Sequence, residues 1–316
     1  MNTLQIVLLI VGIVAVLFLT GSVFAVFFAS YQVYTHTLVR KPGKWGRQIS
    51  EENPELQAMW DAGVEWSKRD EKYLKVLTIK SRDGLKLVAE FYDYGYDTTS
   101  IIMPGRRECC MYSYYYAMAY KNAGSNVLVV DQRAHGLSEG KYATAGILEA
   151  LDVIDWCNEL HENHRQNTVI LHGICVGTCC TVNILRNPEC PTFIKGVIMD
   201  SVFIDYKEIF GRHMMEEGHK LGLTFKAIWF WFKKCTGCNI EESAPLKYID
   251  IVQLPACFIW GKKDVYCLPE KSEIIWQKCT SQRKEVHWFE NGTHSKLRLS
   301  DPNKYDEIFK IKETKE

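Results

Sequence analysis

A series of short apolar runs, separated by stretches of helix length, constrains the fold of this chain more than any other feature. Parallel strands need long crossover connections, usually helices, and strands buried on both faces are rich in apolar, β-branched residues. The series therefore predicts an α/β fold with a mostly parallel sheet and helices on both faces. The runs are SIIMPG, NVLVVD, TVILHG, KGVIMDS, ACFIWG and EVHWFE.

Two strands are expected before this series, and a helical insertion is expected within it. Lys75–Ser81 and Lys86–Tyr94 flank an Arg-Asp-Gly turn, which predicts an antiparallel hairpin. Residues 203–245 interrupt the alternation with FKAIWFWFKK and several polar helical turns. We expect this segment to form a small helical cap above the sheet, within a domain that covers residues 51–316.

The composition excludes several classes of protein. Apolar residues make up 47% of the 316 residues and charged residues 24%, which is typical of a globular enzyme and excludes a disordered chain. The 38 Lys and Arg residues balance the 38 Asp and Glu residues, so the charge gives no indication of a nucleic-acid partner. The 12 cysteines follow no framework spacing, and a chain of this length buries a core without disulfides. Reduced thiols and a reducing compartment are therefore expected.

The N-terminus carries an uncharged apolar segment, Ile6–Ala29. Twenty-four residues form a helix of roughly 36 Å, enough to cross a hydrocarbon core of about 30 Å. A cleaved signal peptide is the alternative, but it has a basic start and a shorter apolar stretch. We therefore expect a single-pass membrane anchor over residues 1–30, followed by a linker over residues 31–50.

Basic residues follow the anchor and predict its orientation. Arg40, Lys41, Lys44 and Arg47 come before the first acidic residue, Glu51. Because basic flanks stay on the cytoplasmic side, the large domain is expected in the cytoplasm, at the cell membrane.

A candidate nucleophile lies at the turn Gly173-Ile-Cys175-Val-Gly177, between a strand-like run and a helix-length stretch. The G-x-C-x-G spacing matches the nucleophile elbow, in which glycines make room for a tight strand-to-helix turn. The helix N-terminus favours the thiolate form of the cysteine. A buried cysteine in an ordinary turn gives the same pattern, so the motif needs support from the rest of the chain.

That support comes from motifs spread over residues 50–310, by which the chain resembles the α/β-hydrolase superfamily. Within it, the sequence is similar to a membrane-anchored bacterial branch, the serine-aminopeptidase/lysophospholipase-like proteins. The order of nucleophile, acid and histidine along the chain is that of the superfamily. The motifs are MPGR at 103–106, DQRAHGLSEGKY at 131–142, the elbow, WGKKD at 260–264 and NGTH at 291–294.

The resemblance implies a catalytic triad of Cys175, Asp264 and His294. Asp264 would orient the imidazole, and His294 would exchange a proton with the nucleophile. The oxyanion hole would use the backbone N–H groups of Arg106 and Val176. Two other histidines, His172 at the end of the elbow strand and His135 in the DQRAHG turn, are interpreted as structural.

Two departures from the superfamily pattern bear on function. Cysteine replaces the usual serine, and Pro104 replaces the histidine that usually precedes the oxyanion-loop glycine. Thiolates attack esters and thioesters well but expel amines poorly, so amides are disfavoured as substrates. We expect a hydrolase that cleaves lipophilic carboxylic esters or thioesters through an acyl-enzyme. An acyltransferase that uses the same cysteine and a catalytically silent binding protein remain alternatives.

No sequence motif indicates a cofactor. A P-loop, a dinucleotide fingerprint and an EF-hand are absent from the sequence, and Cys235-Thr-Gly-Cys238 has no second pair at zinc-site spacing. The aromatic run Trp229–Phe232 is expected to pack a cap helix onto the sheet, or alternatively to line a pocket for an acyl chain.

Overall fold

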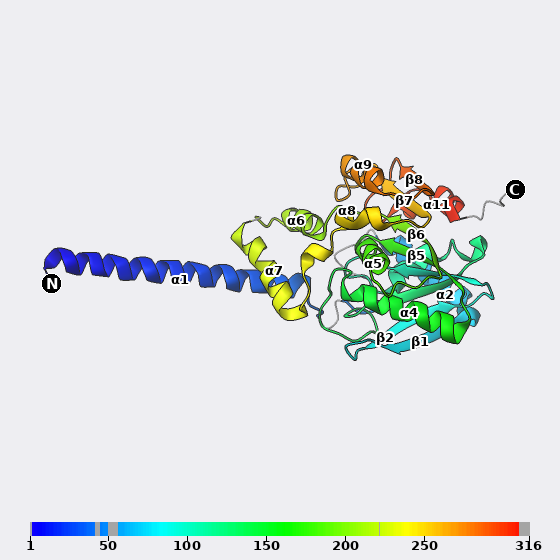
Figure 1. The fold of residues 1–316 in the computed structure, drawn as a ribbon, viewed down its shortest axis with the longest axis horizontal. Coiled ribbons are helices and arrows are strands. Elements are labelled where there is room, and N and C mark those ends of the chain that lie inside the picture. Colours follow the sequence, from blue (N-terminus) through cyan, green and yellow to red (C-terminus); the bar gives the residue numbers. More distant parts are fainter. Residues whose placement is uncertain (1, 42–44, 50–55, 221, 310–316) are drawn as a thin grey trace.

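An eight-stranded sheet forms the centre of the protein (Figure 1). The structure is a computed structural model, which describes residues 2–41, 45–49, 56–220 and 222–309. The strand order is β1-β2-β4-β3-β5-β6-β7-β8. The strands are β1 (Leu74–Lys80), β2 (Lys86–Tyr92), β3 (Thr98–Met103), β4 (Asn126–Asp131), β5 (Thr168–Ile174), β6 (Ile194–Asp200), β7 (Ala256–Gly261) and β8 (Lys284–Phe289).

The pairing of these strands confirms the predicted fold class. β1 and β2 form an antiparallel hairpin, and β2 also pairs antiparallel with β4. All the other pairs, from β4 through β3 and β5 to β8, are parallel. Because the connections between parallel strands carry helices, the C-terminal ends of β3 and β5 to β8 lie at one edge of the sheet, where open α/β folds build their sites.

Helices cover both faces of the sheet (Figure 1). One face carries α4, α5, α8 and α9, and the other carries α2, α3 and α11. The helices of the domain are α2 (Gln57–Arg69), α3 (Cys110–Ala117), α4 (Leu148–His164), α5 (Val176–Leu185), α6 (Tyr206–Glu216), α7 (Leu223–Thr236), α8 (Pro245–Tyr248), α9 (Pro269–Lys278), α10 (Leu297–Ser300) and α11 (Pro302–Phe309). α6 and α7 lie between β6 and β7, in the segment expected to form the cap.

The first helix, α1 (Thr3–Thr37), projects from the domain as a long rod (Figure 1). In the part of the chain that the structure describes, it is the one helix that is long and apolar enough to cross a membrane. It continues past Ala29, so residues 31–37 of the expected linker are helical. Tyr34 and Thr37 are buried against the domain, and this packing extends the helix. Lys44, used above to predict orientation, lies outside the described residues.

The DQRAHG segment is a structural turn. Arg133 makes a two-pronged ion pair with Asp152, with both N···O distances at 2.7 Å, and both side chains are buried. The carboxylate of Asp131 accepts bonds from the backbone N–H groups of Cys110 and Leu137. This segment therefore ties β4 to the helices on either side of it.

We predict that Arg133→Met lowers the free energy of unfolding by about 3–5 kcal/mol, because it leaves the buried Asp152 carboxylate unpaired. The matched control is Arg82→Met, which breaks an exposed pair with Asp155 and should cost no more than about 1 kcal/mol. Urea unfolding of the detergent-solubilised full chain measures both. Equal losses for the two variants would contradict the prediction.

Candidate active site

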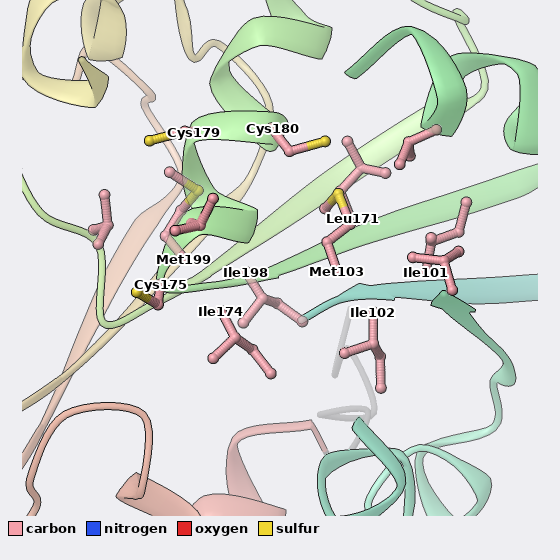
Figure 2. Packing of buried hydrophobic residues seen from close by; sticks show 14 of the residues in the cluster. Ile101, Ile102, Met103, Leu171, Ile174, Cys175, Cys179, Cys180, Ile198 and Met199 are labelled. Carbon is pink, nitrogen blue, oxygen red and sulfur yellow. The ribbon is translucent and has the colours of Figure 1, made fainter. Parts of the chain in front are cut away.

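The turn between β5 and α5 holds Cys175 in a strained backbone conformation. Cys175 has φ of 51° and ψ of −112°, and α5 begins at the next residue. A non-glycine residue in such a conformation costs of order 1–3 kcal/mol and persists only where its surroundings enforce it. Figure 2 shows Cys175 at this sharp turn, directly after Ile174 at the end of β5. The thiol is thereby placed at the C-terminal edge of the sheet.

Two glycines make this turn possible. A Cβ on Gly173 would lie 2.5 Å from the backbone of Gly177, and a Cβ on Gly177 would lie 2.2 Å from the carbonyl oxygen of Met103 in β3. Both distances are far below any contact that a carbon atom tolerates. The glycines of the sequence motif are therefore required so that α5 can start directly against β5 and β3.

The structure brings His294 and Asp264 together. Nδ1 of His294 lies 2.8 Å from Oδ2 of Asp264. The other Asp264 oxygen, Oδ1, accepts the backbone N–H groups of Tyr266 and Cys267, each at 2.8 Å. Three hydrogen bonds therefore fix the carboxylate, which in turn fixes the orientation of the imidazole.

Opposing effects act on the charge state of His294. Burial lowers its pKa, but the interactions with Cys175, Asp264 and Cys267 outweigh burial and raise the pKa well above its usual value. Burial raises the pKa of Asp264, but the charge and hydrogen bond of His294 lower it overall. The positive form of His294 and the ionised form of Asp264 therefore favour each other.

The remaining ring nitrogen of His294 is available for chemistry. Nε2 is buried, and it has no hydrogen-bond partner among the described residues. Cys175 is 5% exposed, and within the same part of the chain no hydrogen bond joins its thiol to His294. The two residues nevertheless interact electrostatically. Nε2 is therefore the ring nitrogen that is left to exchange a proton.

The expected oxyanion donors flank the elbow. Val176 is the first residue of α5, where backbone N–H groups lack helical partners. Arg106 lies in the loop between β3 and α3. In the described ranges, neither of these two backbone N–H groups donates a hydrogen bond. Both are therefore free to bind an oxygen atom.

Two residues next to this site are not identified by the sequence analysis. Cys267 lies 3.5 Å from His294 Nδ1 and 3.1 Å from the carbonyl oxygen of Ser201. Glu108 accepts the backbone N–H of Gly105 and so shapes the loop that carries Arg106. Burial raises the pKa of Glu108. The only sequence signal for Cys267 is its place three residues after Asp264, which lets its N–H reach that carboxylate.

The two competing histidines have structural partners. His172 is buried between the hydroxyls of Tyr120 and Tyr305, and burial lowers its pKa to about 3. The His135 ring donates through Nδ1 to the Arg133 carbonyl oxygen and stacks on Trp45. Among the described residues, neither ring is hydrogen-bonded to Cys175.

One group of side chains at the site has atoms that bind metals. The ligand atoms of Asp264, Cys267 and His294 lie within 4.8 Å of one another. A closed structural zinc site takes four ligands, and here the carboxylate and imidazole already bond to each other. The arrangement fits proton transfer better than metal binding.

Helix α6 lies near His294. The ring of His213 on α6 packs against Tyr266, with centroids 4.0 Å apart, and Tyr266 packs edge-on against His294. The Tyr266 hydroxyl also donates to Glu216 at the end of α6. Burial, together with the positive charges of Arg106 and other neighbours, lowers the pKa of His213 to about 2, so this ring stays neutral. Helix α6, which lies in the segment expected to form the cap, therefore reaches His294 through Tyr266.

No family model matches this chain. The uncharacterized protein YqkD of Bacillus subtilis (strain 168) is 28% identical over 217 residues, which cover 64% of this chain and 70% of that protein. The esterase Pf2001 of Pyrococcus furiosus superposes with a TM-score of 0.64 at 23% identity, covering 77% of this chain and 91% of that one. The mouse α/β hydrolase domain-containing protein 10 gives a TM-score of 0.55 at 16% identity, covering 74% and 95%. These likenesses show that the chain has the α/β-hydrolase fold.

We predict that Gly177→Ala lowers the free energy of unfolding by about 1–3 kcal/mol or more, because its Cβ meets the Met103 carbonyl oxygen. Gly222→Ala is the matched control, since a Cβ there meets no atom within 4 Å. Urea unfolding of the full chain in detergent compares them. A Gly177→Ala variant as stable as the control would show that the turn relaxes without cost.

Proposed function

We propose that this protein is a hydrolase that cleaves carboxylic esters or thioesters, with Cys175 as nucleophile, His294 as acid and base, and Asp264 as the residue that orients His294. The observation that carries the proposal is the strained elbow at Cys175 together with a largely buried, carboxylate-bound imidazole, whose side chain is 11% exposed. Non-glycine residues held at positive φ cluster at functional sites, and Cys175 is one of those that this structure holds there. A silent binding protein would have no use for such an imidazole.

The proposed reaction has two halves. The Cys175 thiolate attacks the carbonyl carbon, the N–H groups of Val176 and Arg106 bind the oxyanion, and protonated His294 gives its proton to the leaving alcohol or thiol. Neutral His294 then takes a proton from water, which attacks the acyl-thioester. The acid leaves, and the proton on His294 restores the starting ion pair.

A small hollow lies next to Cys267, between α6 and α9. Its inner lining is mostly apolar and includes Val202, Phe203, Ile209 and Ile275. An apolar lining favours an acyl chain over a polar substituent.

A substrate panel tests the proposed function. With p-nitrophenyl esters and acyl-CoA thioesters, Cys175→Ala should lower kcat/KM by at least about 10³-fold, because the nucleophile is lost. Cys190→Ala, at a partly exposed thiol outside the site, should leave kcat/KM unchanged. Hydrolysis that survives Cys175→Ala would refute the nucleophile. Acyl transfer to an added alcohol in preference to water would favour the acyltransferase alternative.

The pH profile tests the role of Asp264. Acylation needs protonated His294, so the rate falls as the pH rises through the raised pKa of this residue. Asp264→Asn removes one of the negative charges that raise that pKa, so the alkaline limb should move to lower pH, with kcat reduced by about 10²–10⁴-fold. Asp250→Asn, at an exposed carboxylate, should keep the wild-type profile. An unmoved alkaline limb in Asp264→Asn would contradict the assignment.

We further propose that α1 anchors the protein in a membrane with the domain in the cytoplasm, on the strength of its apolar surface and the basic flank. Protease added to intact spheroplasts that express the chain should leave the domain uncut, and lysis should expose it. Cleavage without lysis would reverse the orientation. Release of the intact chain by alkaline carbonate would refute the anchor.

A further inference from the structure

Helix α7 of the cap has three distinct sides. Ile228 and Phe232 are buried in the domain core. Trp231 packs against α1. The remaining side carries two exposed apolar side chains, Leu223, which is 70% exposed, and Phe230, which stays 49% exposed beside its contact with Phe27 of α1. Neither the sheet nor the rest of the cap covers these two apolar side chains.

The contact between α7 and α1 is specific. The Trp231 indole Nε1 lies 3.2 Å from the Phe27 carbonyl oxygen and 3.0 Å from the buried Ser30 hydroxyl, to which it donates. Phe230 packs edge-on against Phe27, and Trp231 packs against Tyr31, with ring centroids 4.9 Å apart. The position of α7 along α1 is therefore fixed by a hydrogen bond and by aromatic packing.

This contact lies at the end of the apolar segment of α1. Phe27 is inside the uncharged run that ends at Ala29, and Tyr31 lies just beyond it. If that run fills the hydrocarbon core, α7 lies at the level of the lipid headgroups. Trp and Tyr residues are enriched at this level, because their rings are apolar at one end and polar at the other. Figure 1 shows α7 crossing α1 where α1 leaves the domain.

The side chains on the exposed side of α7 are of the kinds that bind a membrane surface. Lys226, Lys233 and Lys234 are interspersed with Leu223 and Phe230, and α7 contains no acidic residue. Apolar and basic side chains on one helix face are typical of helices that lie in a membrane interface with anionic lipid. The lysines would contact phosphates while Leu223 and Phe230 enter the acyl boundary.

We propose that α7 docks on the lipid bilayer, with Leu223 and Phe230 inserted at the headgroup boundary. The inference rests on the proposal that α1 spans the membrane, and it adds a second membrane contact within the cap. It does not depend on the chemistry of Cys175, so it can fail while the proposed hydrolase activity stands.

Site-specific photocrosslinking tests this docking. The full chain is reconstituted into vesicles of phosphatidylethanolamine and phosphatidylglycerol with p-benzoylphenylalanine at position 223, 230, 18 or 76, and adducts are identified by mass spectrometry. Phe18, 74% exposed on α1, is the positive control. Val76, 58% exposed on β1, is the matched negative control. Lipid adducts are expected at positions 223, 230 and 18 and not at position 76.

Three outcomes would overturn the proposal. Adducts at position 18 alone would show an anchored chain whose cap does not touch lipid. Crosslinks from position 223 or 230 to a second copy of the chain would assign this face to a protein contact. Absence of lipid adducts at position 18 would refute the membrane anchor, and with it the docking of α7.

Replacing Lys226, Lys233 and Lys234 together by Gln should lower the adduct yield at position 223 severalfold. An unchanged yield would refute the proposed contact between these lysines and anionic lipid.

Discussion

The steric constraint at the start of α5 determines the rest of the site. Because Gly173 and Gly177 lack side chains, α5 begins directly after Cys175 and runs against β5 and β3. The thiol is thereby fixed at the sheet edge, where the loops after β3, β6, β7 and β8 converge. The same turn leaves the Val176 N–H without a helical partner. The close approach of α5 to β5 and β3 therefore accounts for the backbone strain at Cys175, the position of its thiol and the free N–H of Val176.

The groups that interact with His294 are the second determinant of the site. The His294 imidazole contacts the Asp264 carboxylate and the Cys267 thiol, and its interactions with these groups and with Cys175 outweigh the effect of burial on its pKa. α6 packs on Tyr266, which contacts this ring, and Trp231 of α7 donates a hydrogen bond to Ser30 of α1. Arg107, in the loop that carries Arg106, reaches the carbonyl oxygens of His36 and Thr37 at the end of α1. Helix α1 therefore contacts both α7 and the loop between β3 and α3.

Most of the fold was predictable from the sequence, because alternating apolar runs and turn signals are local. All eight strands, the hairpin and the elbow helix begin within a few residues of where the sequence indicates them. The contacts of Cys267, Glu108 and Trp231 were not predictable, since each depends on which distant segments meet. Trp231 illustrates this limit: the sequence suggests that the aromatic run packs on the sheet, but one side of it packs on α1 instead.

The central claim is that Cys175 becomes acylated during turnover. The most direct test is to mix the full chain with p-nitrophenyl butyrate, quench with acid within seconds, and map the modified peptides by mass spectrometry. The account predicts one butyryl group on Cys175, at a level that falls once the ester is consumed. Butyrylation spread over other cysteines, or turnover of the ester with no acyl group on Cys175, would contradict it.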